Sequence, residues 1–153
     1  MKYKFALCVF LLCLATAAAL SDDKLDDPWD SSELVAPTTL AAQLRTITPG
    51  RSILCVGPTA AYRRAHVPNA ILAGPDSKPK GLTLLSEAVK NIPHDADLII
   101  YCGCCPFVRC PNIRPAYRAL KEMGYIHIRI LKLNTDLNTD WVEKGFAIDL
   151  STN

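Results

Sequence analysis

Short runs of apolar residues recur along the chain from residue 31 onward, and longer stretches with helical periodicity separate them. An unbroken apolar run bounded by turn residues is typical of a buried strand. The run at 98–101 is apolar at every position and follows Asp95 and Asp97, which indicates a central strand covered on both faces. In all, we predict strands at 53–56, 70–73, 98–101 and 126–131.

Amphipathic stretches between these strands predict helices. Apolar residues three and four positions apart place one face of each stretch against a core, and proline or glycine marks where each stretch ends. Gly124 is expected to cap a helix, and the segment 74–81, rich in Pro, Gly and Lys, is expected to be a loop. We predict helices at 38–44, 82–89, 113–123 and 141–144, with one or two helical turns at 60–64.

The alternation of strands and helices is typical of units that build a parallel sheet. We therefore predict an α/β protein: a single domain with a parallel central sheet and helices on both faces. The chain has 153 residues, and the about 130 that remain without the N-terminal segment described next suit one domain. Its formal net charge of +2 gives no electrostatic indication of nucleic-acid binding.

The N-terminus has the pattern of a secretory signal peptide. Lys2 and Lys4 precede an apolar run at 5–14, and small residues follow at 15–19. The apolar run is shorter than the roughly 20 residues that span a bilayer. We therefore predict a cleaved signal at 1–19 rather than a membrane anchor.

Export then sets the expected location and domain limits. A lipid-modified Cys8 or Cys13 is an alternative, but a leucine precedes each of them where a small residue would be expected. We expect a periplasmic or extracellular protein whose mature form has no stable membrane span. Residues 20–31 are polar and acidic and are expected to be a flexible lead-in to a domain at 32–150.

Four cysteines lie within nine residues directly after the predicted strand at 98–101. In open α/β sheets ligands bind at this edge, where the next helix directs free N–H groups toward them. N–H groups of the helix terminus and of the loop, together with Arg109 and Arg114, favour a thiolate over a thiol. We therefore expect a reactive nucleophile among the cysteines of this loop, which are Cys102, Cys104, Cys105 and Cys110.

Five separate segments agree, in the correct order, with the pattern of one family. They are ILCVG at 53–57, YRRAHVPNAI at 62–71, LIIYC at 98–102, RPA with AL and GY within 114–125, and W with GF within 141–146. In these segments the chain resembles the rhodanese-like sulfurtransferases, and the resemblance covers about 32–150.

The resemblance implies a fold, a reaction and a set of site residues. In that family a cysteine takes sulfur from a donor such as thiosulfate, holds it as a persulfide and passes it to a thiophilic acceptor. Cys102 is the residue that follows the corresponding strand, and we expect no cofactor and no metal. The residues expected to bind the substrate or support the loop are Gly103, Cys104, Cys105, Arg109, Cys110 and Arg114.

The loop departs from the family pattern in its length, because it extends to Arg114. Counted back from the helix, Cys110 lies near the expected place, and Cys104 has the usual spacing to Arg109, so both remain alternatives to Cys102. A related fold supports cysteine phosphatases, which need five residues between the cysteine and the arginine. No cysteine here has that spacing.

The same cysteines are compatible with other roles. Without the signal five cysteines remain, an odd number, so a disulfide leaves a thiol for redox or sulfur-relay chemistry. Clustered thiolates also suit a metal, although adjacent Cys104 and Cys105 are expected to point apart and to be poor ligands for zinc; soft Cu(I) is more tolerant. A third alternative is a binding module without turnover.

Cys55 and Gly57 bear on that third alternative, because they stand where the family usually has Asp and Arg after its first strand. Cys55 is most simply a small buried residue of its strand. Alternatively, because it ends a parallel strand at the same edge as Cys102, the two sulfurs face each other.

Overall fold

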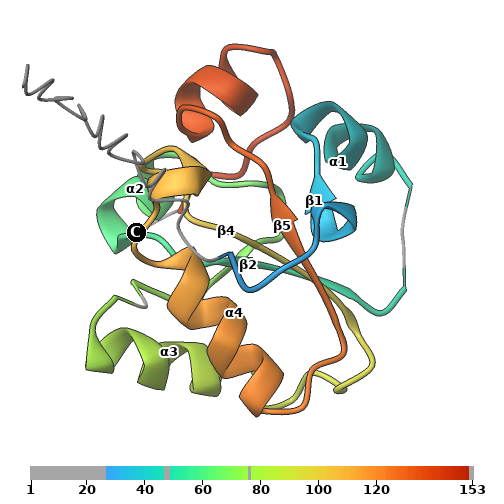
Figure 1. Ribbon diagram of the computed structural model, residues 1–153. Helices are drawn as coiled ribbons and strands as arrows, with labels where there is room; N and C mark the ends of the chain where they lie inside the picture. Colours follow the sequence, from blue (N-terminus) through green and yellow to red (C-terminus); the bar gives the residue numbers. More distant parts are fainter. Residues whose placement is uncertain (1–26, 47–48, 76, 152–153) are drawn as a thin grey trace, which may run out of the picture.

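The computed structural model describes residues 27–46, 49–75 and 77–151. They form a parallel five-stranded sheet in the order β1-β5-β4-β2-β3 (Figure 1). The predicted α/β class and parallel sheet are therefore confirmed, while the predicted signal at 1–19 lies outside the described residues. The strands are β1 (Leu34–Val35), β2 (Arg51–Cys55), β3 (Ile71–Leu72), β4 (Asp97–Tyr101) and β5 (His127–Leu131).

β4 is the central strand, as its apolar sequence predicts. It pairs in parallel with β2 on one side and with β5 on the other. Leu98, Ile99 and Ile100 are completely buried because helices cover both faces of the sheet at this strand. The carboxyl end of β4 therefore lies between the carboxyl ends of β2 and β5, at the centre of that edge of the sheet.

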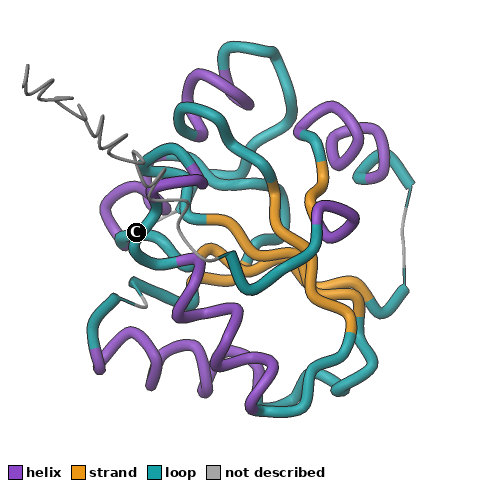
Figure 2. The backbone as a smooth tube through the Cα atoms, viewed as in Figure 1, coloured by secondary structure: helices purple, strands orange, loops and turns teal. Residues whose placement is uncertain are grey.

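Helices pack on both faces, which confirms the predicted layers. Leu85 of α3 and Leu120 of α4 belong to the core on one face, and Figure 2 shows these two helices side by side. Leu40 of α1 and Trp141 belong to the core on the other face. The helices are α1 (Pro37–Gln43), α2 (Thr59–Arg64), α3 (Pro79–Val89) and α4 (Ile113–Glu122), with short 3-10 helices η1 (Ser31–Glu33) and η2 (Phe107–Arg109) and a π-helical turn η3 (Asn138–Val142).

Three elements differ from the predicted ones. Helix α3 begins at Pro79, so the prediction of a loop through residue 81 is wrong. Proline is favoured at the first position of a helix because a backbone N–H there would have no acceptor within the helix, so the helix loses no hydrogen bond. β1 has only two residues, too few to give an apolar pattern, and pairing with β5 defines it. The last helical turn covers 138–142 instead of 141–144.

The end of the predicted lead-in packs on the domain. Trp29 is 8% exposed, its ring lies 5.6 Å from that of Tyr117 in an edge-to-face arrangement, and the guanidinium carbon of Arg114 lies 5.3 Å from its centroid. The Trp29 side chain thus packs this segment on α4. Within the described ranges, no helix has the length and apolar character needed to cross a membrane.

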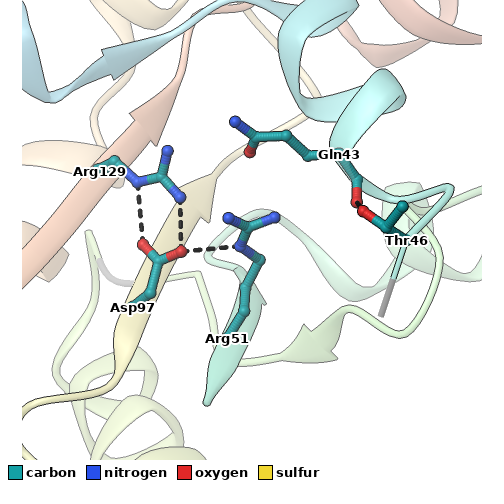
Figure 3. Close-up of polar contacts among 5 residues, drawn as sticks. All are labelled: Gln43, Thr46, Arg51, Asp97 and Arg129. Carbon is teal, nitrogen blue, oxygen red and sulfur yellow. Dashed lines mark hydrogen bonds and ion pairs between the residues drawn. The ribbon is translucent and has the colours of Figure 1, made fainter. Parts of the chain in front are cut away.

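An ion-pair network ties three strands together far from the cysteines. Asp97, the first residue of β4, accepts hydrogen bonds from Arg51 of β2 at 2.7 Å and from Arg129 of β5 at 2.6 and 2.9 Å (Figure 3). Burial alone would raise the pKa of Asp97, but these two arginines outweigh it and lower the pKa. The network fixes the amino-terminal end of β4 between its neighbours.

Candidate active site

The cysteine loop begins where β4 ends. Gly103 directly follows Cys102 and adopts a φ of +81°, a conformation that favours glycine. Its carbonyl accepts a hydrogen bond of 3.0 Å from the amide of Leu137, and the amide of Phe107 donates one of 2.9 Å to Leu133. The segment after β5 therefore holds the loop over the sheet edge, as expected for a ligand site of this architecture.

Three sulfur atoms converge within this loop. The Sγ atoms of Cys102 and Cys104 are 3.3 Å apart, those of Cys104 and Cys105 are 3.6 Å apart, and those of Cys105 and Cys102 are 4.0 Å apart. The prediction that adjacent Cys104 and Cys105 point apart is wrong, because the turn that follows Gly103 brings both side chains to the sulfur of Cys102. All three thiols are free.

Cys102 is the thiolate of the group. A hydrogen bond from the Cys110 thiol is the largest influence on it and lowers its pKa; burial opposes this. The Asn112 side-chain amide, at 3.2 Å, and the backbone N–H and thiol of Cys104 lower the pKa further, to about 5. At neutral pH the sulfur of Cys102 is therefore an anion held by neutral donors.

The other three loop cysteines stay protonated because burial and the neighbouring Cys102 thiolate raise their pKa values. The hydrogen bond to Cys102 raises the pKa of Cys110, and burial adds to it. Burial raises the pKa values of Cys104 and Cys105 most; next come the hydrogen bond to Cys102 for Cys104 and the charge of Cys102 for Cys105. The loop thus holds one thiolate and several thiol donors.

Helix α4 acts on Cys102 through Cys110. Backbone N–H groups of Asn112 and Ile113, at the start of α4, hydrogen-bond the Cys110 sulfur. Cys110 in turn is a hydrogen-bond donor to the Cys102 sulfur and keeps its proton. Of the helix and loop amides that were expected to favour the anion, the turn amide of Cys104 acts on Cys102 directly, and those of Asn112 and Ile113 act on the neighbouring Cys110.

Arg109 and Arg114 were expected to favour the Cys102 thiolate by their positive charge, but both side chains have other surroundings. Arg114 is buried and donates to the carbonyls of Val108, at 2.9 Å, and Cys110, at 3.4 Å, and it forms an ion pair with Asp27. Arg109 is exposed on η2, and neither arginine is among the causes of the lowered pKa of Cys102. Arg114 instead holds the loop to the N-terminal segment.

Asn112 is a site residue that sequence reasoning missed. It is 3% exposed and does not cap α4. Its side-chain oxygen Oδ1 accepts a hydrogen bond of 3.1 Å from the backbone amide of Ser77, and its side-chain nitrogen Nδ2 donates to the Cys102 sulfur. Asparagine before a helix is ordinarily interpreted as a cap, so only the fold reveals this second role.

A pocket of about 510 Å³ opens beside Cys102. Arg64 of α2 is the cation among the residues that line it, and sequence reasoning missed this role as well. Cys102 itself is only 1% exposed, and the pocket borders it. The lining residues are Cys55, Ala61, Tyr62, Arg64, Ala65, Cys102, Gly103, Cys104, Asp136, Leu137, Asn138, Val142 and Ile148.

Cys55, the last residue of β2, and Gly57, two residues after it, lie against Cys102. The Cys55 thiol donates a hydrogen bond of 3.7 Å to the carbonyl oxygen of Cys102, and both residues line the pocket. Gly57 comes so close that a Cβ atom there would overlap the Cys102 carbonyl oxygen and lie 3.3 Å from its sulfur. The two residues that depart from the family pattern are therefore part of the site.

The chain is similar to known proteins in its three-dimensional structure. No protein-family model matches the chain, and no curated protein matches its sequence. Two of the solved structures that do match are a rhodanese-like domain of the Alr3790 protein from Anabaena sp. (17% identity, TM-score 0.59, 78% of this chain and 80% of that one) and the single-domain sulfurtransferase RDL2 from Saccharomyces cerevisiae (19%, 0.55, 73% and 89%).

A third match is a thiosulfate sulfurtransferase from Pseudomonas aeruginosa, with 22% identity, a TM-score of 0.57 and coverage of 77% of this chain and 19% of that larger one. The protein has a rhodanese-like fold. The resemblance that the sequence segments indicated is thus confirmed for the architecture. In this rhodanese-like fold, Cys102 lies at the carboxyl end of the central strand and beside the pocket.

Proposed function

We propose that the protein is a sulfurtransferase that carries sulfane sulfur as a persulfide on Cys102. The observation that supports this most is a single thiolate, with a pKa lowered to about 5, between hydrogen-bond donors and a pocket. The thiolate is the nucleophilic form of cysteine, and a lowered pKa makes it available at neutral pH. The rhodanese-like fold and its sulfurtransferase neighbours agree with this chemistry.

The reaction needs two displacements at sulfur. The Cys102 thiolate attacks the sulfane sulfur of a donor such as thiosulfate, the donor S–S bond breaks, and sulfite leaves with the bonding electron pair. The persulfide anion that results is a hydrogen-bond acceptor like the thiolate, so the donors around Cys102 also suit it. A thiol or cyanide acceptor then attacks the outer sulfur and regenerates the thiolate. Arg64 in the pocket wall suits an anionic donor.

Replacing Cys102 with serine should abolish sulfur transfer. The hydroxyl is not ionised at neutral pH, so thiocyanate production from thiosulfate and cyanide should fall to the uncatalysed rate. Intact-mass analysis after donor treatment should show one added sulfur on the wild-type protein and none on Cys102→Ser.

Cys104→Ser is the matched variant, because it removes the most exposed sulfur of the cluster and leaves Cys102 in place. It should still form the persulfide. If Cys102→Ser keeps the added sulfur and the activity, another cysteine is the nucleophile. If the wild-type protein accepts no sulfur from any donor, the function is that of a binding module.

A further inference from the structure

Cys102, Cys104 and Cys105 are arranged as a ligand set for a metal ion. Their sulfur atoms all lie within 4.8 Å of one another, and no other His, Cys, Asp or Glu of the described residues completes the group. A point equidistant from sulfurs separated by 3.3, 3.6 and 4.0 Å lies about 2.1 Å from each, close to the about 2.3 Å of a metal–thiolate bond. An ion slightly out of the sulfur plane reaches all three without movement of the loop.

The loop holds this triangle in place through contacts that do not involve the sulfurs. The positive φ of Gly103 returns the chain so that the side chains on either side of it meet. The amide of Phe107 is bonded to Leu133, and Arg114 donates to the carbonyls of Val108 and Cys110. A site that needs little rearrangement binds an ion more tightly, because its ligands lose little conformational freedom on binding.

We propose that Cys102, Cys104 and Cys105 bind one Cu(I) ion with three sulfur ligands. Sulfur-only donor sets select soft ions, which excludes Mg²⁺ and Ca²⁺. Zn²⁺ takes four ligands in its structural sites, whereas Cu(I) is satisfied by three thiolates. Cys104 is exposed and Cys105 is partly exposed, so an ion can enter from solvent.

Binding changes the protonation of the cluster but not its oxidation state. Cys104 and Cys105 are thiols before the ion binds, and each releases its proton to solvent on binding. Cys102 is already a thiolate and releases no proton. No electron is transferred, since the ion enters as Cu(I). The ion binds the Cys102 sulfur, which the proposed reaction also uses, so a chain that holds copper should not carry a persulfide on Cys102. This consequence rests on the proposed function, whereas copper binding itself does not.

The test titrates the reduced, metal-free protein with Cu(I) under anaerobic conditions against a chromogenic Cu(I) chelator. We expect one copper per chain by native mass spectrometry and three sulfur neighbours at about 2.3 Å by X-ray absorption. Cys104→Ser and Cys105→Ser should each weaken the apparent affinity at least tenfold. Ser86→Ala, at an exposed position of α3, is the control and should keep the wild-type affinity, because Ser86 lies outside the group of three.

Cys104 is exposed, so its replacement leaves the core intact and keeps the titration interpretable. The proposal is overturned by absence of copper binding, by unchanged affinity in Cys104→Ser and Cys105→Ser, or by stoichiometric zinc bound in preference to Cu(I). Because these measurements contain no sulfur donor, they are independent of the persulfide assay. A protein that binds copper and transfers no sulfur would refute the proposed function alone.

Discussion

At the scale of single residues, the charge of the site depends on neutral groups. The Cys102 thiolate receives hydrogen bonds from the Cys110 thiol, the Asn112 amide and the turn at Cys104. Hydrogen bonds to an anion are stronger than those between neutral groups, which is why they outweigh the burial of the sulfur. The thiolate is thus stabilised by neutral hydrogen-bond donors.

Asn112→Ala should raise the pKa of Cys102, because it removes one of these donors. A hydrogen bond to a charged group contributes about 1.5–3 kcal/mol, so the midpoint of thiolate formation should rise by about 1 to 2 pH units. The measurement is the rate of alkylation of Cys102 against pH, with the labelled residue identified by mass. In the wild type this rate should be level at neutral pH and fall as the pH falls through about 5, where the thiolate is protonated.

Asn91→Ala, at an exposed position after α3, is the control and should leave the midpoint unchanged. An unchanged midpoint in Asn112→Ala would show that the Asn112 amide does not stabilise the anion.

At the scale of elements, the site exists because β2 and β4 approach one another closely at their carboxyl ends. The amide of Val56 donates to the carbonyl of Tyr101 at 2.8 Å, which extends the pairing of β2 and β4 to the start of the cysteine loop. Gly57 comes next and leaves no room for a side chain against Cys102. An arginine, which the family usually has there, would not fit this backbone.

Gly57→Ala should therefore lower the free energy of unfolding by about 3 kcal/mol, since a rigid backbone atom stands where the methyl group would go. It should also change the alkylation midpoint of Cys102, whose sulfur lies beside the new group. Gly145→Ala is the control: its φ is +75° but nothing lies within 4 Å of an added Cβ.

Gly145→Ala should cost about 1 kcal/mol of backbone strain and leave the alkylation midpoint unchanged. Chemical denaturation measures both changes in stability. Equal losses in the two variants would contradict the close packing of β2 on the loop.

At the scale of the whole molecule, the sheet separates a reactive edge from a stabilising one. The cysteines lie after the carboxyl end of β4, and Asp97 with its two arginines lies at the opposite end of the same strand (Figure 3). Changes at Asp97 therefore act on stability rather than on the thiolate, which makes the two ends separable by mutation.

Asp97→Asn should lower the free energy of unfolding at neutral pH by about 1–3 kcal/mol, because two arginines lose a charged partner. The folded state lowers the pKa of Asp97, so its stabilising contribution is present above the unfolded pKa and is lost as the pH falls through the lower folded one. The variant should consequently lose less stability than the wild type on acidification. Denaturation at several pH values, with exposed Asp95→Asn as the control, checks this; parallel pH curves for the two variants would refute it.

The sequence alone determined the α/β class, the central strand and the place of the cysteines. An unbroken apolar run that alternates with helical stretches is typical of a parallel strand buried on both faces, and the end of such a strand lies at the sheet edge. Local pattern also sufficed for α4 and its cap at Gly124. It did not suffice for the two-residue β1, which exists through pairing with β5, or for α3, whose first turn contains residues typical of loops.

Only the tertiary structure decided how the cysteines divide their roles. Which sulfur is charged depends on donors that come from the turn, from Cys110 and from Asn112, and spacing along the chain does not fix the direction of a side chain. Arg64 and Cys55 reach the pocket from segments about 40 residues away in sequence, and Arg114 turns from the sulfur to the N-terminal segment. Pairing, burial and side-chain direction arise when distant segments pack, so they belong to the fold and not to any local pattern.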